Sequence, residues 1–247
     1  MEKRINIFSD SWFWSWTHTL KSKLDVENRS HLPSMKWFLE DFGYEVIEYC
    51  QPADSFQQIV EKYFIQEEFK PDADYSFVFF SGLVRRQIDD WVKHCHDYDE
   101  FNTWYDNEMN THLDILEAWA VKYDHPVIIA GGHSRLDSKY VEGRKNIYLL
   151  CEDILQDLVG TTFPWAKTTN MMKDSFRRFK LTGDIIDKEL DSWHPKLVDE
   201  IHTSLKHFED NSLVKNFTFP DGGHLNIQAH YYLVDWLHDF IQKKVVK

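Results

Sequence analysis

The 247-residue chain has few cysteines, glycines and prolines, and it has no long apolar run. Its three cysteines, Cys50, Cys95 and Cys151, show no CxxC spacing, so the sequence predicts no disulfide framework and fits a reducing compartment. No run approaches the roughly 20 apolar residues of a membrane span. The short apolar segment 5–8 ends at Ser9, which is too short for a signal peptide. We therefore expect a cytoplasmic protein, or one released without a signal peptide.

Positive charge is also scarce. The chain has 28 Lys and Arg against 41 Asp and Glu, which gives a formal net charge of −13. Nucleic-acid binding needs a clustered cationic face, and an anionic membrane surface attracts the same charge. We therefore expect neither a nucleic acid nor an anionic membrane as a partner. Small neutral or cationic molecules, or another protein, fit the charge better.

Ligand motifs for cofactors and metals are missing as well. The pair Gly131-Gly132 lacks GxGxxG or Walker spacing, so no nucleotide cofactor is predicted. His94 and His96 form an HxH motif, but no HExxH or Cys/His ligand set accompanies it. We expect no metal and no cofactor, and we interpret the HxH segment as a polar loop or a solvated helix face.

Aromatic residues, in contrast, are abundant. They make up 16% of the chain, and ten of them are tryptophans. Most are expected in the core, but so many predict some exposed rings, which would suit a binding cleft or an oligomer contact. The tryptophans at 12, 14 and 16 fit packing better than a sugar platform.

Short, nearly continuous apolar runs alternate with helical patterns. The runs cover 5–8, 44–50, 75–82, 126–132 and 146–151, and runs of this kind are typical of parallel strands buried on both faces. Helices are expected over 31–42, with Gly43 as C-cap, over 54–65, with Asp54 or Ser55 as N-cap, and over 108–123. This alternation predicts an α/β sandwich with a mostly parallel sheet, whose ligand site lies at the carboxyl edge.

Residues 152–219 break this rhythm. They hold helical-looking pieces with Pro, Gly and Trp interruptions and no parallel-strand pattern. We interpret them as a helical insertion in a single domain that spans 1–247.

The clearest chemical signal lies near the C-terminus. Asp221 and His224 flank a glycine pair, and a helical pattern with Tyr232, Leu233 and Trp236 follows. Three residues of separation bring two side chains together on one turn. An Asp beside a His fixes the imidazole tautomer and leaves the other ring nitrogen free to act as a base. Ser11 follows the first strand, at the expected functional edge, and offers the hydroxyl that such a base activates.

This order of motifs resembles the SGNH or GDSL-type serine hydrolases. The first block of that family reads Gly-Asp-Ser, and here it reads Ser9-Asp10-Ser11. The last block, Asp-x-x-His followed by Leu-Asn, matches at 221–226. The resemblance implies a flavodoxin-like, three-layer α/β/α fold with a five-stranded sheet, and a triad of Ser11, His224 and Asp221.

The two middle blocks depart from the family pattern. The usual second-block glycine is replaced by Ala53, which keeps its backbone N–H as an oxyanion donor. The third block, usually Gly-x-Asn-Asp, has Gly82 but carries Val84 and Arg85 in place of Asn and Asp. The loss of one such side-chain donor costs about 10²–10³ in rate. Arg85, Arg86 and His133 are candidate substitutes, and Asp10 and Gly82 are further substrate-binding candidates.

The resemblance implies an esterase that cleaves short acyl esters, such as acetyl groups on a carbohydrate, through an acyl-enzyme. Two alternatives stay open. One is a catalytically impaired binding or structural protein on the same fold, with an aromatic surface as its contact. The other is an acyltransferase, which the same triad can run when water is excluded.

Overall fold

The computed structural model describes residues 3–9, 35–50, 54–65, 70–80, 82–83, 98–132, 135–160, 225 and 227–245. Its centre is a five-stranded sheet in the order β2-β1-β3-β4-β5. All of the pairings are parallel. This is the flavodoxin-like order, in which the chain changes direction across the sheet between β1 and β3.

The strands form where the apolar runs predict them. They are β1 (Lys3–Ser9), β2 (Tyr44–Cys50), β3 (Tyr75–Phe80), β4 (Val127–Gly131) and β5 (Ile147–Cys151). Every residue of β3 and β4 is buried, as strands covered by helices on both faces must be. The α/β class and the mostly parallel five-stranded sheet are confirmed.

The helices connect the strands and cover the sheet. In chain order they are α2 (Met35–Asp41), α3 (Phe56–Ile59), the π-helical turn η1 (Val60–Phe64), α5 (Tyr98–Lys122), the 3₁₀ turn η2 (Ser138–Tyr140), α6 (Ile154–Val159), α11 (Ile227–Phe240) and the π-helical turn η3 (Ile241–Val245). Gly43 ends the first of these with φ of 83°, and Ser55 is the N-cap of the second. Gly43 was predicted as the C-cap, and Ser55 was one of the two predicted N-cap candidates, with Asp54.

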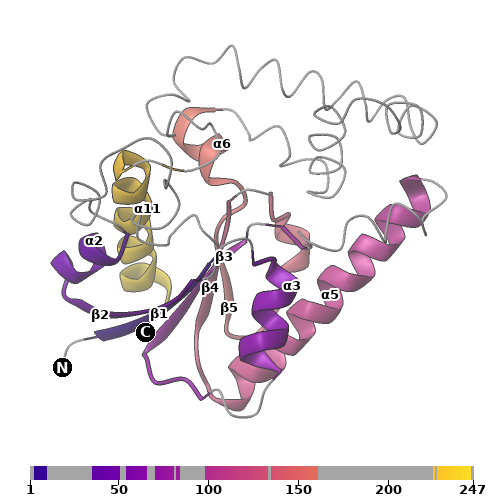
Figure 1. Cartoon of the computed structure of the whole chain (residues 1–247), viewed down its shortest axis with the longest axis horizontal. Helices are drawn as coiled ribbons and strands as arrows, with labels where there is room; N and C mark the ends of the chain where they lie inside the picture. The colour runs from indigo at the N-terminus through magenta and orange to yellow at the C-terminus, as the bar shows by residue number, and fades with distance from the viewer. Residues whose placement is uncertain are drawn as a thin grey trace, which may run out of the picture.

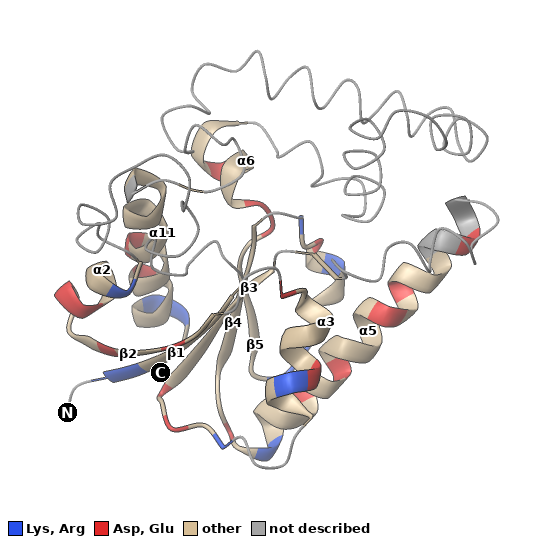
Figure 2. Cartoon of the chain, viewed as in Figure 1, with Lys and Arg blue, Asp and Glu red and all other residues tan. Residues whose placement is uncertain are grey.

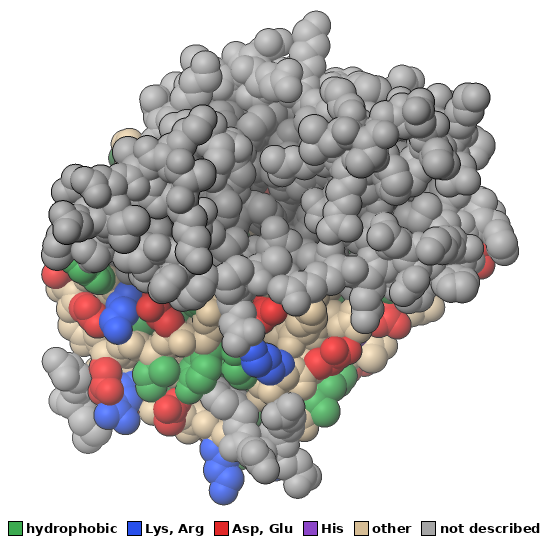
Figure 3. Space-filling model, viewed as in Figure 1, with side chains coloured by type: hydrophobic (Ala, Val, Ile, Leu, Met, Phe, Trp, Pro, Cys, Tyr) green, Lys and Arg blue, Asp and Glu red, His purple; other side chains and the backbone are tan. Residues whose placement is uncertain are grey.

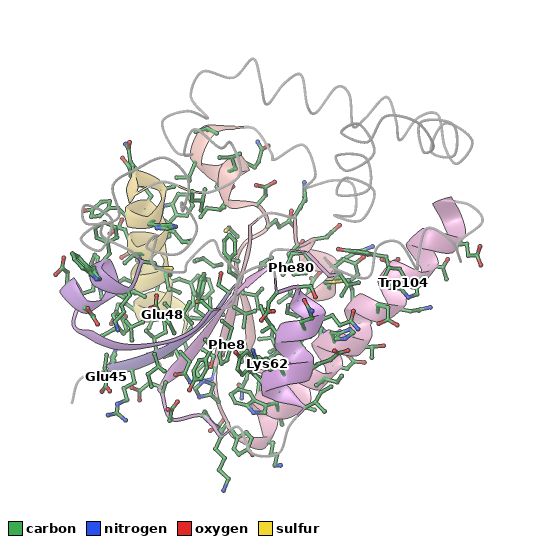
Figure 4. The ribbon with its side chains drawn as sticks, viewed as in Figure 1. Phe8, Glu45, Glu48, Lys62, Phe80 and Trp104 are labelled. Atoms are coloured by element: carbon green, nitrogen blue, oxygen red, sulfur yellow. The ribbon has the colours of Figure 1, made fainter. Side chains whose placement is uncertain are left out.

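Three layers result (Figure 1). Helices α2 and α11 lie on one face of the sheet, and α3 and α5 lie on the other. Alternate strand residues point into two separate cores. Ile5, Ile7 and Phe77 pack toward α2 and α11, whereas Phe8 and Phe80 pack toward α3 and α5 (Figure 4).

Helices α2 and α11 run side by side. The rings of Phe38 and Tyr231 meet edge to face, with centroids 5.6 Å apart, and Phe42 lies 4.5 Å from His238. Four of the exposed large hydrophobic residues lie in these two helices or, in the case of Phe42, directly after α2: Trp37, Phe42, Tyr231 and Tyr232. Exposed rings were predicted, and on the described part of the chain they gather here.

The surface carries charges of both signs. Acidic side chains recur along α5 (Figure 2), among them Asp106, Asp114 and Glu117. On the face shown in Figure 3, cationic side chains lie among acidic and hydrophobic ones. Within the described segments, no helix is both long enough and apolar enough to cross a membrane.

Candidate active site

The carboxyl edge of the sheet is where five chain segments leave the strands together. The last strand residues there are Ser9, Cys50, Phe80, Gly131 and Cys151. In open α/β sheets, ligands bind in the crevice outside this edge, at the point where the strand order reverses. Here that point lies between β1 and β3. The segment after β1 therefore leaves the sheet at the switch point.

The serine at the end of β1 is not accessible. Ser9 is fully buried and pairs with Cys50 in the β1–β2 register. A nucleophile has to meet its substrate, so Ser9 is excluded. The predicted nucleophile, Ser11, follows two residues later. Ser11 and Asp10 lie outside the described residues.

The predicted base and its acid, His224 and Asp221, also lie outside the described residues. The chain is anchored directly after them. Leu225 is fully buried and belongs to the same core as Ala229, Leu233 and Val234 of α11. The anchor fixes where the Asp221–His224 segment joins the described fold.

The start of α3 follows the second block. Its backbone amides already donate hydrogen bonds within the protein. Ser55 Oγ accepts from the Gln58 amide at 3.2 Å, while Gln58 Oε1 accepts from the Ser55 amide at 2.9 Å. The amides of Phe56 and Gln57 donate to the carbonyls of Gly82 and Leu83, at 2.8 and 3.1 Å. The first three amides of α3 are thus not available to an oxyanion. A second-block donor must precede them, and Ala53, the predicted one, lies outside the described residues.

Gly82 has a conformational reason to be glycine. Its φ is 125°, a region that residues with a Cβ rarely adopt. Its carbonyl faces the amide of Phe56, so this loop is tied to the start of α3. Gly82 is therefore placed at the predicted edge. Arg85, Arg86 and Val84 lie outside the described residues.

The loop after β4 crosses toward both neighbouring strands. The Gly132 amide donates to the Phe80 carbonyl at 3.0 Å, and the Leu136 amide donates to the Glu152 carbonyl at 2.9 Å. The guanidinium of Arg135 forms an ion pair with Glu152, directly after β5. His133 lies outside the described residues.

Sequence reasoning missed two acidic residues at the end of β5. The Ser138 hydroxyl and amide, together with Arg135, hold the pKa of Glu152 below its ordinary value. Asp153 caps α6, because its Oδ1 accepts from the amides of Leu155 and Gln156 at 3.0 and 3.1 Å. Burial raises the pKa of Asp153 to about 6. Their position directly after the fifth apolar run was the sequence signal that could have identified them.

Two other nucleophile candidates are inert. Burial raises the pKa of the Cys151 thiol well above its ordinary value, so the thiol stays protonated at neutral pH. A second Ser–His pair exists, with Ser76 Oγ 2.9 Å from His125 Nε2. Both of its side chains are buried, and they lie at the opposite, amino-terminal end of the sheet. This pair is structural.

The described segments hold no group of three or more His, Cys, Asp or Glu side chains that could bind a metal ion. The HxH motif of His94 and His96 lies outside them.

The sequence matches no protein-family model and no curated protein. Among solved structures, the chain is similar to the psychrotrophic esterase EstA from Pseudoalteromonas sp., with 10% identity and a TM-score of 0.48, over 99% of this chain and 100% of that chain. It is also similar to a lipase/acylhydrolase from Enterococcus faecalis, with 13% identity and a TM-score of 0.42, over 97% and 95% of the two chains. A member of the lipolytic protein G-D-S-L family from Veillonella parvula has 9% identity and a TM-score of 0.40, over 97% and 98%. These similarities are too distant to transfer a residue or a reaction to this chain.

Proposed function

We propose that the chain is a serine esterase of the SGNH type, acting on short acyl esters. One observation carries the proposal. Strand β1 ends at the switch point of a flavodoxin-like sheet, and the Ser9-Asp10-Ser11 block begins with its last residue. The sequence supplies the partner motif, Asp221-x-x-His224, directly before the anchored residue Leu225 and α11.

In the proposed reaction, His224 removes the proton of the Ser11 hydroxyl while Ser11 Oγ attacks the ester carbonyl carbon. Asp221 holds the imidazole and stabilises it once protonated. Backbone N–H groups of Ser11 and Ala53 stabilise the negative oxygen of the tetrahedral intermediate. The intermediate then collapses, and His224 gives its proton to the departing alcohol.

Water completes the cycle. His224 takes a proton from the water, whose oxygen attacks the acyl-enzyme, and the carboxylic acid leaves as Ser11 regains its proton. Residues Asp10, Gly82, Arg85 and His133 are the candidates for binding the acyl group and supplementing the oxyanion donors. Acetyl esters on carbohydrate are one substrate class that this arrangement would accept.

The replacement Ser11→Ala tests the proposal. It should lower the turnover of p-nitrophenyl acetate by at least about a thousandfold, because the nucleophile is lost. Ser9→Ala is the matched control, and it should keep most of the activity, since the Ser9 hydroxyl is buried. Undiminished activity in Ser11→Ala would contradict the assignment.

One position of the sequence favours the alternative that the protein is a binding module. Val84 stands where the family carries its side-chain oxyanion donor, which fits a binding module that retains the fold without the reaction. Folded protein that a fluorophosphonate probe fails to label would support this alternative. Acyl transfer to a sugar acceptor that outpaces hydrolysis would instead identify an acyltransferase.

A further inference from the structure

Glu152, directly after β5, makes three separate contacts with the loop that follows β4. Its carbonyl accepts from the Leu136 amide at 2.9 Å. Its Oε1 accepts from the Ser138 amide at 2.8 Å, and its Oε2 pairs with the Arg135 guanidinium. One residue directly after β5 thus holds the distal half of the loop that leaves β4.

The proximal half of this loop is fixed by close packing. A Cβ on Gly131 would come within 1.7 Å of the Glu152 carbonyl oxygen, and a Cβ on Gly132 would come within 1.9 Å of the Phe79 ring. Only glycines allow the backbone to pass this closely. The chain that leaves β4 therefore passes close to Glu152 and to the Phe79 ring of β3.

The loop also contacts the end of β3, the neighbouring strand. The Gly132 amide donates to the carbonyl of Phe80, the last residue of β3. Two residues further on, the carbonyls of Gly82 and Leu83 accept from the first amides of α3. Ala53 lies just before that helix in the sequence. Backbone hydrogen bonds thus join the β4 loop to Glu152 and to Phe80, and join residues 82–83 to the start of α3.

The contacts of Glu152 contribute unequally to holding the loop in place. The Arg135 side chain is 40% exposed, and exposed ion pairs contribute little. The carboxylate contact with the Ser138 amide satisfies a backbone donor and fixes the chain itself. We expect the position of the carboxylate oxygen, more than the charge pair with Arg135, to hold the loop.

We propose that Glu152 is a positioning residue of the esterase. It holds residues 135–138 of the β4 loop at the carboxyl edge, and the same loop carries the oxyanion candidate His133 in the sequence. This inference rests on the proposed function. Glu152 touches no reacting atom in this scheme, so its effect appears in kcat through the geometry of the loops.

Glu117 of α5 provides a matched control. Its Oε1 accepts from the Lys145 amide at 2.8 Å, and its Oε2 accepts from Arg144 at 3.1 Å. Like Glu152, it accepts from one backbone amide and one arginine, whereas Glu152 also interacts with the Ser138 hydroxyl. However, it lies before β5, at the amino-terminal edge of the sheet, away from the proposed site.

The experiment compares Glu152→Asp, Glu152→Gln and Glu117→Asp in the full chain. It measures kcat and KM for p-nitrophenyl acetate, and Tm by calorimetry. Glu152→Asp keeps the charge but shortens the side chain out of reach of the Ser138 amide. It should lower kcat at least about tenfold, because small misplacements of a catalytic group are costly, and leave KM within about threefold.

The two other variants are expected to keep a kcat close to that of the wild type. Glu152→Gln keeps an oxygen that accepts from Ser138, so its kcat should stay within about threefold of the wild type. Glu117→Asp should lower Tm about as much as Glu152→Asp does and leave kcat unchanged. Equal kcat in Glu152→Asp and Glu117→Asp, or a loss in Glu152→Gln as large as in Glu152→Asp, would overturn the proposal.

The same assay separates the two levels of inference. Wild-type protein without turnover, or turnover unaffected by Ser11→Ala, overturns the proposed function. Wild-type turnover that depends on Ser11 but not on Glu152 overturns only the positioning role.

Discussion

His125 lies buried just before β4, where its Nε2 forms a 2.9 Å hydrogen bond with Ser76 Oγ. Burial lowers the pKa of His125 to about 4, although Asp74 and Asp72 act in the opposite direction. The folded protein therefore keeps this imidazole neutral where an unfolded chain would protonate it. Between pH 6.5 and 4, the folded state therefore binds fewer protons than the unfolded state. The free energy of unfolding falls as the pH falls through this window.

The replacement His125→Gln should flatten this pH dependence. From pH 7 to pH 4.5, the wild type should lose unfolding free energy on the order of 2 to 3 kcal/mol more than His125→Gln does, since only the wild type has the buried imidazole. Urea unfolding at the two pH values measures the difference. Ser76→Ala is the control. It should cost about 1 kcal/mol at both pH values and keep the slope. The same slope in His125→Gln and wild type would contradict this explanation.

Single residues were predictable where the reason is local. Ser55 and Gly43 were predicted as caps because a cap depends on three or four neighbouring residues. Glu152 was not predicted, because its contacts with Leu136 and Ser138 depend on two loops that only the sheet brings together. Ser11, Asp221 and His224 remain predictions, since they lie outside the described residues.

At the scale of elements, the turn after β4 depends on the absence of side chains at two positions. Gly131→Ala should cost at least about 3 kcal/mol of unfolding free energy, because its Cβ would overlap the Glu152 carbonyl and backbone has little freedom to move. Gly143→Ala should cost about 1 kcal/mol, since its φ is 81° but no atom lies within 4 Å of the new Cβ. Urea unfolding of both variants tests this order, and the reverse order would show that the packing argument is wrong.

The elements also show where apolar patterns are sufficient. All five strands were predicted to within about two residues, because buried parallel strands leave continuous apolar runs. Helix α5 was expected over 108–123, yet it begins at Tyr98. Its added part carries Trp104 and, at helical spacing from Met109, Tyr105, and both rings pack against the core. The acidic residues between the aromatic ones hid this continuation of the apolar stripe. The π-helical ends of α3 and α11 were not predicted, because a single extra residue in a turn leaves the apolar stripe almost unchanged.

At the scale of the whole molecule, one sheet separates two cores. Leu233 of α11 is fully buried in the core on one face, and Leu113 of α5 is fully buried in the core on the other. Each replacement by Ala should cost about 2 to 5 kcal/mol. The double variant should be additive within about 0.5 kcal/mol, because the sheet lies between the two sites.

Chemical unfolding of the single and double variants measures this additivity. The exposed residue Val121 gives a control, since Val121→Ala should change stability by less than about 0.5 kcal/mol. Strongly non-additive costs would show that the two cores are coupled through the strands. The predicted single domain with an insertion at 152–219 stays a prediction, because most of that segment lies outside the described residues.

The position of α11 has a consequence for the order of events during synthesis. The interior strand β1 leaves the ribosome long before α11, one of the two helices that cover the same face of the sheet, which is made more than 200 residues later. Until then, Ile5, Ile7 and Phe77, which pack against it, lack their final cover on the nascent chain. Chains that expose apolar strands in this way are prone to aggregation. We therefore expect newly made protein to depend on chaperone binding until the last helix has emerged.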